Sequence, residues 1–115
     1  MPDTCLFCRI VRREIPAAVV AETDTVLAFR DVNPQAPLHA LVVPKRHIAG
    51  LAAAAADDAR VVGELALVAA RVAQDAGYGD SGFRTVVNSG DDAGQTVHHL
   101  HLHVLAGRPL RWPPG

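Results

Sequence analysis

The sequence has 115 residues, 50% of them hydrophobic, and a formal net charge of −1 with neutral histidines. This length suits one domain, so we expect residues 1–115 to form a single domain with a buried core. Basic residues form no run longer than two, which argues against binding to polymeric nucleic acid. The first residues lack the regions of a signal peptide, and no apolar run could span a membrane. We therefore expect a cytoplasmic protein that does not bind membranes.

The first part of the chain predicts a short helix and a hairpin. Residues 5–13 could form the helix, which Pro16 would end because proline disfavours its continuation. The β-branched runs 17–21 and 25–31 are separated by a polar turn and predict two strands.

A third strand and a long helix follow. The mostly apolar segment 39–44 predicts a buried strand. From Asp57, a suitable N-cap, to about Ala76, apolar residues recur at helical spacing, and Gly77 then acts as a stop signal.

The end of the chain predicts two more strands, 83–87 and 97–105, joined by the Gly/Asp-rich loop 88–95. Hairpins combined with one main helix predict an α+β fold with a largely antiparallel sheet.

The expected last strand holds four of the six histidines. In a regular strand His99, His101 and His103 would share one face, with leucines between them facing the core. The outer two would lie roughly 13 Å apart, too far for all three to bind one metal. Such a row suits nucleophilic attack and proton transfer near neutral pH. The alternative, a histidine-rich polar face without chemistry, is less favoured because exposed strand faces ordinarily use other polar residues.

The preceding segment 89–96 offers glycines, backbone amides and the Thr96 hydroxyl beside this row. Such a segment can form an anion-binding nest, although it could also be an ordinary connecting loop.

The string His99-Leu-His101-Leu-His103-Val-Leu matches the His-x-His-x-His-x-x signature of the histidine triad family. The chain resembles this family over nearly its whole length, including segments 7–16, 28–39 and 43–47. Its ending, 107–115, is similar to that of the Hint branch, the purine nucleoside phosphoramidases.

This resemblance implies a HIT-like fold with a five-stranded antiparallel sheet, one long helix and a short N-terminal helix. It also implies a homodimer with one nucleotide site per subunit. His101 would attack the α-phosphate, with His39 close behind it, and Thr96 or His103 could pass a proton to the leaving group.

The same resemblance implies the nucleotide-binding residues. Phe7, Ile10 and Val32 would line the base pocket, Asp31 would hold the ribose, and Asn88, Gly94, Gln95, Thr96, His101 and His103 would surround the phosphate. Trp112 would lie against the other subunit, near its active site. Core packing is the alternative role for the three apolar residues.

The expected activity is cleavage of purine nucleoside 5′-phosphoramidates, or related nucleotidyl conjugates, to the nucleoside monophosphate through a nucleotidyl-histidine. The alternatives are a dinucleoside polyphosphate hydrolase and a purine-nucleotide-binding scaffold without turnover.

The only two cysteines, Cys5 and Cys8, have the spacing of half a four-ligand zinc site. We expect His47 and His99 to complete it, as the resemblance to bacterial family members also suggests. His98 competes for the fourth position but would point to the opposite face from the triad. Zinc would then be structural, pinning the N-terminal segment to the catalytic strand. The alternatives are two free buried thiols or a redox pair.

Overall fold

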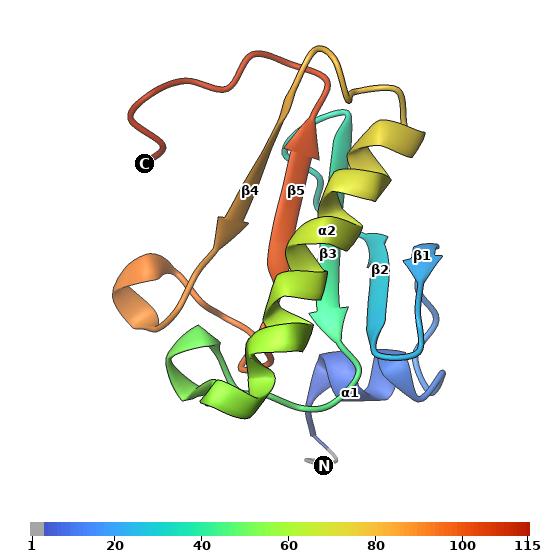
Figure 1. Ribbon diagram of the computed structural model, residues 1–115, viewed down its shortest axis with the longest axis vertical. Helices are drawn as coiled ribbons and strands as arrows, with labels where there is room; N and C mark the ends of the chain where they lie inside the picture. The colour runs from blue at the N-terminus through green and yellow to red at the C-terminus, as the bar shows by residue number, and fades with distance from the viewer. Residues whose placement is uncertain (1–3) are drawn as a thin grey trace.

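The computed structural model describes residues 4–115; residues 1–3, part of the start in which we expect no signal peptide, lie outside the described part. Five antiparallel strands form one sheet in the order β1-β2-β3-β5-β4 (Figure 1). The elements are α1 (Leu6–Val11), β1 (Val19–Glu22), β2 (Val26–Arg30), β3 (Leu38–Pro44), α2 (Ala59–Asp75), β4 (Phe83–Val87) and β5 (Leu102–Ala106). The expected α+β fold with one long and one short N-terminal helix is confirmed.

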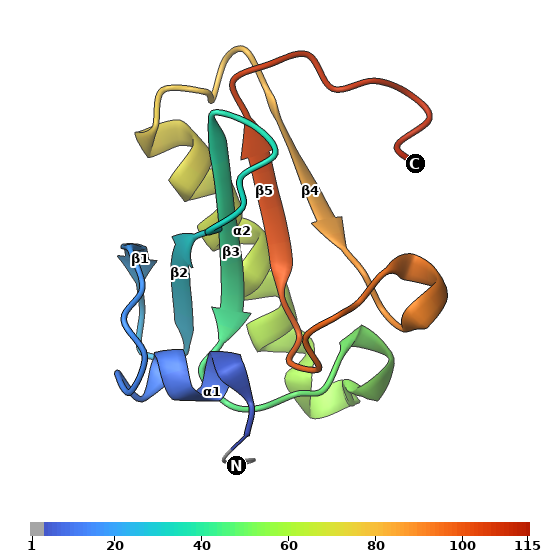
Figure 2. The same ribbon diagram turned by 180° about the vertical axis from the view of Figure 1, so that it is seen from behind.

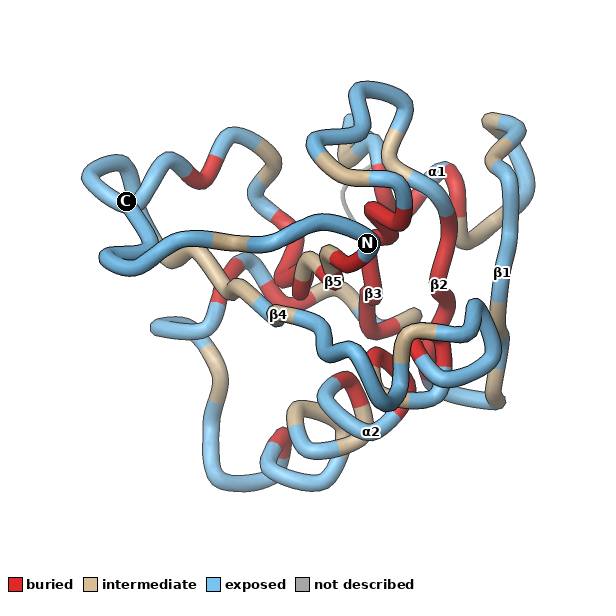
Figure 3. The backbone as a smooth tube through the Cα atoms, turned by 90° about the horizontal axis from the view of Figure 1, so that it is seen from above, coloured by how far each residue is buried: buried red, intermediate tan, exposed pale blue. Residues whose placement is uncertain are grey.

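The two faces of the sheet carry different cores. Alternate residues of the central strands, such as Ala40 and Val42 of β3, pack with Leu65 and Val72 of α2 on one face. On the other face, Leu41 and its neighbours pack against α1, which crosses the lower end of the sheet (Figure 2). Seen from above, the buried chain is concentrated in the central strands, whereas β1, β4 and the C-terminal segment carry mostly exposed or half-buried residues (Figure 3).

The last strand is shorter than predicted. It begins at Leu102 rather than at residue 97, so His99 and His101 precede it. Opposite it, β3 ends at Pro44, which has no N–H to extend the ladder. The backbone N–H of Leu100 donates to the Ile48 carbonyl instead, 2.6 Å away. The predicted regular strand through His99 is therefore wrong, although Phe7 of α1 contacts the rings of both His99 and His101, and the ring of His101 contacts that of His103.

The start of the long helix also differs from the prediction. A 3₁₀ turn, Ala56–Asp58, precedes α2, and the N-cap residue is Asp58 rather than Asp57. Its carboxylate accepts from the backbone N–H of Ala55 and pairs with the guanidinium of Arg46. These contacts tie the helix start to the segment after β3. No helix within 4–115 is long and apolar enough to cross a membrane.

Truncating Leu65 tests the role of α2 in the larger core. Leu65 is 1% exposed, so Leu65→Ala should lower the free energy of unfolding by about 2–5 kcal/mol through lost burial and a cavity. Arg71→Ala, on the exposed side of the same helix, should change it by no more than about 0.5 kcal/mol. Urea unfolding followed by circular dichroism measures both; equal losses would contradict this account of the core.

Candidate active site and metal centre

Strand pairing places two histidines together on the face that carries α1. His103 of β5 lies opposite Leu41 of β3, and His39 lies opposite Leu105. His39 and His103 are thus diagonal neighbours across the ladder, a relation in which long side chains can touch. Their rings lie 5.2 Å apart, and the ring of His101 lies 5.1 Å from that of His103.

The backbone fixes which nitrogen of His101 carries the proton. The His101 Nδ1 lies 2.7 Å from the carbonyl oxygen of His99, which can only accept a hydrogen bond. Nδ1–H is therefore the donor, and in the neutral ring Nε2 keeps its lone pair. Only 6% of His101 is exposed, and Phe7 packs edge-on against its ring at 5.1 Å. The structure thus presents an oriented nitrogen nucleophile.

A second chain of hydrogen bonds fixes the tautomers of His39 and His103. The backbone N–H of Gln35 donates to Nδ1 of His39, so the proton of His39 is on Nε2. That nitrogen lies 2.9 Å from Nδ1 of His103 and 3.4 Å from a carboxylate oxygen of Asp31. His103 then carries its own proton on Nε2, where it can donate to a bound group.

Burial keeps both of these rings neutral. Burial, followed by the neighbouring His101 and His39, lowers the pKa of His103 to about 4, and Asp31 opposes the shift. The pKa of His39 is also lowered by burial, against the opposing charge of Asp31. Near neutral pH, therefore, both imidazoles act as uncharged hydrogen-bonding groups.

A cavity of about 590 Å³ opens onto these histidines. The residues that line it include seven of the predicted site residues: Phe7, Ile10, Asp31, Val32, Thr96, His101 and His103. Val32 is 100% exposed at its rim. Sequence reasoning missed several apolar lining residues, including Ile15, Pro16, Phe29, Leu41 and Val97. The alternation of β2 and β3 carried a signal for Phe29 and Leu41, because both lie on the face of His103.

Four of the predicted nucleotide-binding residues do not line this cavity: Asn88, Gly94, Gln95 and Trp112. The Gln95 amide is held by backbone groups, since its Nε2 donates to the carbonyls of Ala49 and Val97 and its Oε1 accepts from Gly90. Trp112 is 83% exposed in the C-terminal segment beyond the sheet. His39 lies behind His103 rather than in the cavity lining.

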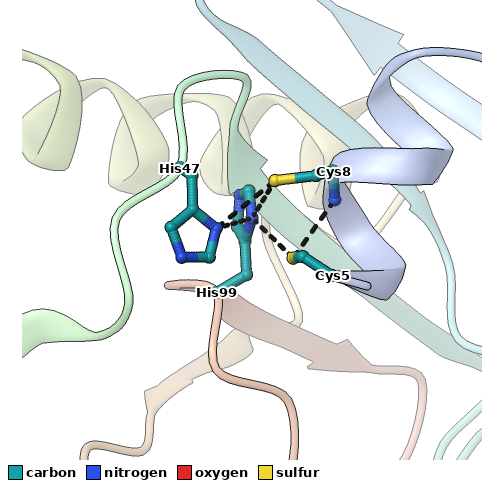
Figure 4. Close-up of side chains that lie close together, drawn as sticks. All are labelled: Cys5, Cys8, His47 and His99. Atoms are coloured by element: carbon teal, nitrogen blue, oxygen red, sulfur yellow. Dashed lines mark hydrogen bonds between the residues drawn. The ribbon is translucent and has the colours of Figure 1, made fainter. Parts of the chain in front are cut away.

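Cys5, Cys8, His47 and His99 converge beside this cavity, from α1, the segment after β3 and the segment before β5 (Figure 4). The Nδ1 atoms of His47 and His99 lie 3.2 Å apart. The Cys8 sulfur lies 3.3 Å from Nδ1 of His47 and 3.5 Å from Nδ1 of His99. The Cys5 sulfur lies 3.4 Å from Nδ1 of His99. These four residues, chosen from the sequence, are therefore brought together, and His98 is left exposed outside the group.

These residues fit a tetrahedral metal ion. Zinc ligands at about 2.0–2.3 Å from the ion would lie roughly 3.3–3.8 Å from one another, close to the spacings above. His99 is completely buried, and its Nε2 donates to the carbonyl of Pro44 at 2.8 Å. Its Nδ1 lone pair therefore points at the other three ligand atoms, as a metal ligand requires.

Without a bound cation, the surroundings of Cys8 disfavour its thiolate form. Burial, followed by the hydrogen bond and charge of Cys5, raises its pKa to about 11. Burial lowers the pKa of His99, opposed by its bond to Pro44. A divalent ion would displace the proton of the Cys8 thiol and bind the neutral imidazole of His99. The four residues therefore suit a bound metal ion better than a state with two free thiols.

Comparison with known proteins identifies the family. A profile of the HIT domain matches residues 12–110. An uncharacterized HIT-like protein of Synechocystis is 55% identical over 115 residues, 100% of both chains. The crystal structure of a HIT family hydrolase from Legionella pneumophila has a TM-score of 0.95 at 46% identity, covering 97% of this chain and 100% of that chain. A histidine triad protein from Clostridium difficile has a TM-score of 0.93 at 43% identity, covering 96% of each chain. The chain belongs to the HIT (histidine triad) family, as its histidine motif indicates.

The low pKa of His103 makes stability depend on pH. An unfolded histidine titrates near 6.5 and His103 near 4, so the unfolded state takes up the proton first as the pH falls. The free energy of unfolding should therefore fall from pH 6.5 toward pH 4, by at most about 1.4 kcal/mol per pH unit for this group.

Urea unfolding at pH 7 and pH 5 tests this. His103→Asn should lose less stability between the two pH values than the wild type does. His98→Asn, an exposed histidine outside the network, is the matched control and should follow the wild type. Identical pH dependence in all three proteins would contradict the assignment.

Proposed function

We propose that this protein hydrolyses purine nucleoside 5′-phosphoramidates, or related nucleotidyl conjugates, to the nucleoside monophosphate. The observation that carries the proposal is the buried His101, whose Nδ1–H is held by the His99 carbonyl so that Nε2 is a free nucleophile. Its neighbourhood supports a nucleotide substrate, since the cavity combines an apolar part with a few polar groups. The fold shared with a HIT family hydrolase supports hydrolysis.

In this proposal the apolar part of the cavity receives the base. Phe7, Ile10 and Phe29 offer ring and aliphatic surface to a planar purine. Asp31 holds the ribose hydroxyls, a role that suits a carboxylate beside an apolar pocket. The phosphate then lies near His101, with the N–H of His103 and the hydroxyl of Thr96 as donors to its oxygens.

The reaction proceeds in two displacements. Nε2 of His101 forms a bond to phosphorus as the phosphorus–nitrogen bond to the leaving amine breaks, and Thr96 or His103 passes a proton to that amine. Water then attacks phosphorus and the bond to His101 breaks, which releases the monophosphate. His39 positions His103 through their shared hydrogen bond, and the Gln35 backbone N–H fixes the tautomer of His39.

Zinc, bound by Cys5, Cys8, His47 and His99, is the cofactor we propose, with a structural role. It would supply a cross-link between three segments of the chain and would take no part in the displacement. Phe7 lies between the two cysteines and contacts the rings of both His99 and His101. The cross-link would therefore hold a wall of the nucleotide pocket against the nucleophile.

The partner we propose is a second copy of the chain. β4 is the strand at one edge of the sheet, and Phe83 and Trp112 are large, exposed apolar residues on β4 and in the segment after β5. Pairing of two edge strands would extend the sheet and cover such residues. Trp112 would then lie near the active site of the other subunit.

Replacing the nucleophile tests the reaction. His101→Asn should abolish turnover of adenosine phosphoramidate, by at least about 10³-fold, while AMP binding is retained because the pocket remains. In the wild type, mass spectrometry after rapid quenching should find AMP attached to His101. His98→Asn is the matched control and should keep turnover within about threefold of the wild type.

The same assay separates the alternatives. Faster turnover of diadenosine polyphosphate than of the phosphoramidate would favour a dinucleoside polyphosphate hydrolase. Tight binding of AMP without turnover of either substrate would favour the scaffold role. Near wild-type turnover by His101→Asn would show that the proposed nucleophile is wrong.

Metal analysis tests the zinc proposal. The purified protein should contain about one zinc per chain, and Cys5→Ser/Cys8→Ser should lose it and unfold at a lower temperature, because the cross-link is gone. Metal-free wild-type protein of unchanged thermal stability would refute the proposal.

Deleting residues 110–115 tests the dimer and the role of Trp112. The truncated protein should keep its thermal stability within a few degrees but change its relative rates on phosphoramidates with different amines, because the segment would contact the leaving group. Analytical ultracentrifugation should give the mass of a dimer for both proteins. A monomeric wild type, or unchanged relative rates across the substrates, would contradict the proposal.

A further inference from the structure

The metal centre has one sealed side and one open side. Cys8 and His99 are both 0% exposed. Cys5 and His47, in contrast, are half-buried and line a second cavity of about 410 Å³. A small molecule entering this cavity would meet the sulfur of Cys5 before that of Cys8.

The two sulfur atoms are also close enough to react with each other. They lie within 4.8 Å, and the backbone N–H of Cys8 points at the Cys5 sulfur from 3.4 Å. Cys5 is the extended residue before α1, and Cys8 lies in its first turn. Closing a disulfide needs the sulfurs to approach to about 2.05 Å, a movement within reach of side-chain rotation and a small shift of Cys5. C-x-x-C pairs with this placement are typical of reversible disulfides.

We propose that Cys5 and Cys8 form a thiol–disulfide exchange site, entered through Cys5, at which a low-molecular-weight disulfide oxidises the pair and expels the metal. The inference rests on the metal centre described under Proposed function.

The low-molecular-weight disulfide is itself the oxidant in this exchange. The Cys5 thiolate attacks one sulfur of the small disulfide, forming a mixed disulfide and releasing one small thiolate. The Cys8 thiolate then attacks the Cys5 sulfur, forming the Cys5–Cys8 bond and releasing the second small thiolate. The pair loses two electrons and the small disulfide gains them. A disulfide is a poor ligand, so the metal keeps only two imidazoles and leaves.

Two short connections link the metal centre to the nucleotide pocket, so oxidation of the cysteines would affect the pocket. The carbonyl of His99 holds the Nδ1–H of His101. Phe7, carried between the cysteines, packs against the rings of both histidines at 5.9 and 5.1 Å. Loss of the cross-link would loosen both connections, so oxidation should weaken nucleotide binding.

Glutathione disulfide added to the zinc-loaded wild-type protein provides the test. The chain has only two cysteines, so every thiol lost is assigned. We expect mass spectrometry to show loss of two hydrogens with a Cys5–Cys8 cross-link, and a chromogenic chelator to show release of one zinc per chain. Acid quenching at early times should place the first glutathione on Cys5. The oxidised protein should bind AMP at least about threefold more weakly, and dithiothreitol with zinc should restore it.

Two single variants test the order of attack. Cys8→Ser should stop at a stable mixed disulfide on Cys5. Cys5→Ser, whose only thiol is the completely buried Cys8, should react at least about tenfold more slowly. Any of four results would overturn the inference: two persistent thiols, a first adduct on Cys8, retention of zinc after the cross-link forms, or unchanged AMP affinity. A zinc-loaded protein that resists oxidation would overturn this inference alone, whereas a protein that never binds zinc would overturn the metal centre as well.

Discussion

The hydrogen bond from Nδ1 of His101 to the carbonyl of His99 is the constraint on which the rest of the site depends. It forms only because the chain bends before β5 instead of continuing the ladder. Pro44 ends the opposing strand without an N–H to offer, and its carbonyl accepts from the His99 ring instead. One interruption of the sheet therefore orients both the proposed nucleophile and a proposed metal ligand.

The fold tolerates this interruption because the two faces of the sheet have different roles. The face covered by α2 carries the larger apolar core and supplies most of the burial that stabilises the fold. The opposite face can then bury imidazoles, whose desolvation disfavours their charged forms and lowers the pKa values of His39 and His103. In their neutral forms His39 and His103 donate hydrogen bonds without a repulsive positive charge. The burial that keeps these imidazoles neutral is thus also what lowers the stability of the fold at acidic pH.

The sequence predicts the elements well because their signals are local. The aromatic and β-branched run in 83–87 and the helical spacing of α2 depend on neighbouring residues, and both elements form. The histidine motif likewise identifies the family. The bend at His99 could not be predicted, because it depends on Pro44 and Ile48, about fifty residues earlier in the chain. For the same reason the cysteine spacing indicates only half of the proposed metal site, and the amide of Gln95, expected at the phosphate, instead donates to the backbone carbonyl of Ala49, 46 residues earlier in the chain.

The bend also explains how one short segment can serve two sites. In a straight strand the rings of His99 and His101 would point the same way, and a proposed metal ligand would stand in the proposed nucleotide pocket. In the bent segment the ring of His99 turns toward Cys5, Cys8 and His47, while His101 faces the cavity. Phe7 lies against both rings and separates the metal centre from the pocket. The two sites share a backbone but no ligand, and the His99 carbonyl and Phe7 connect them directly.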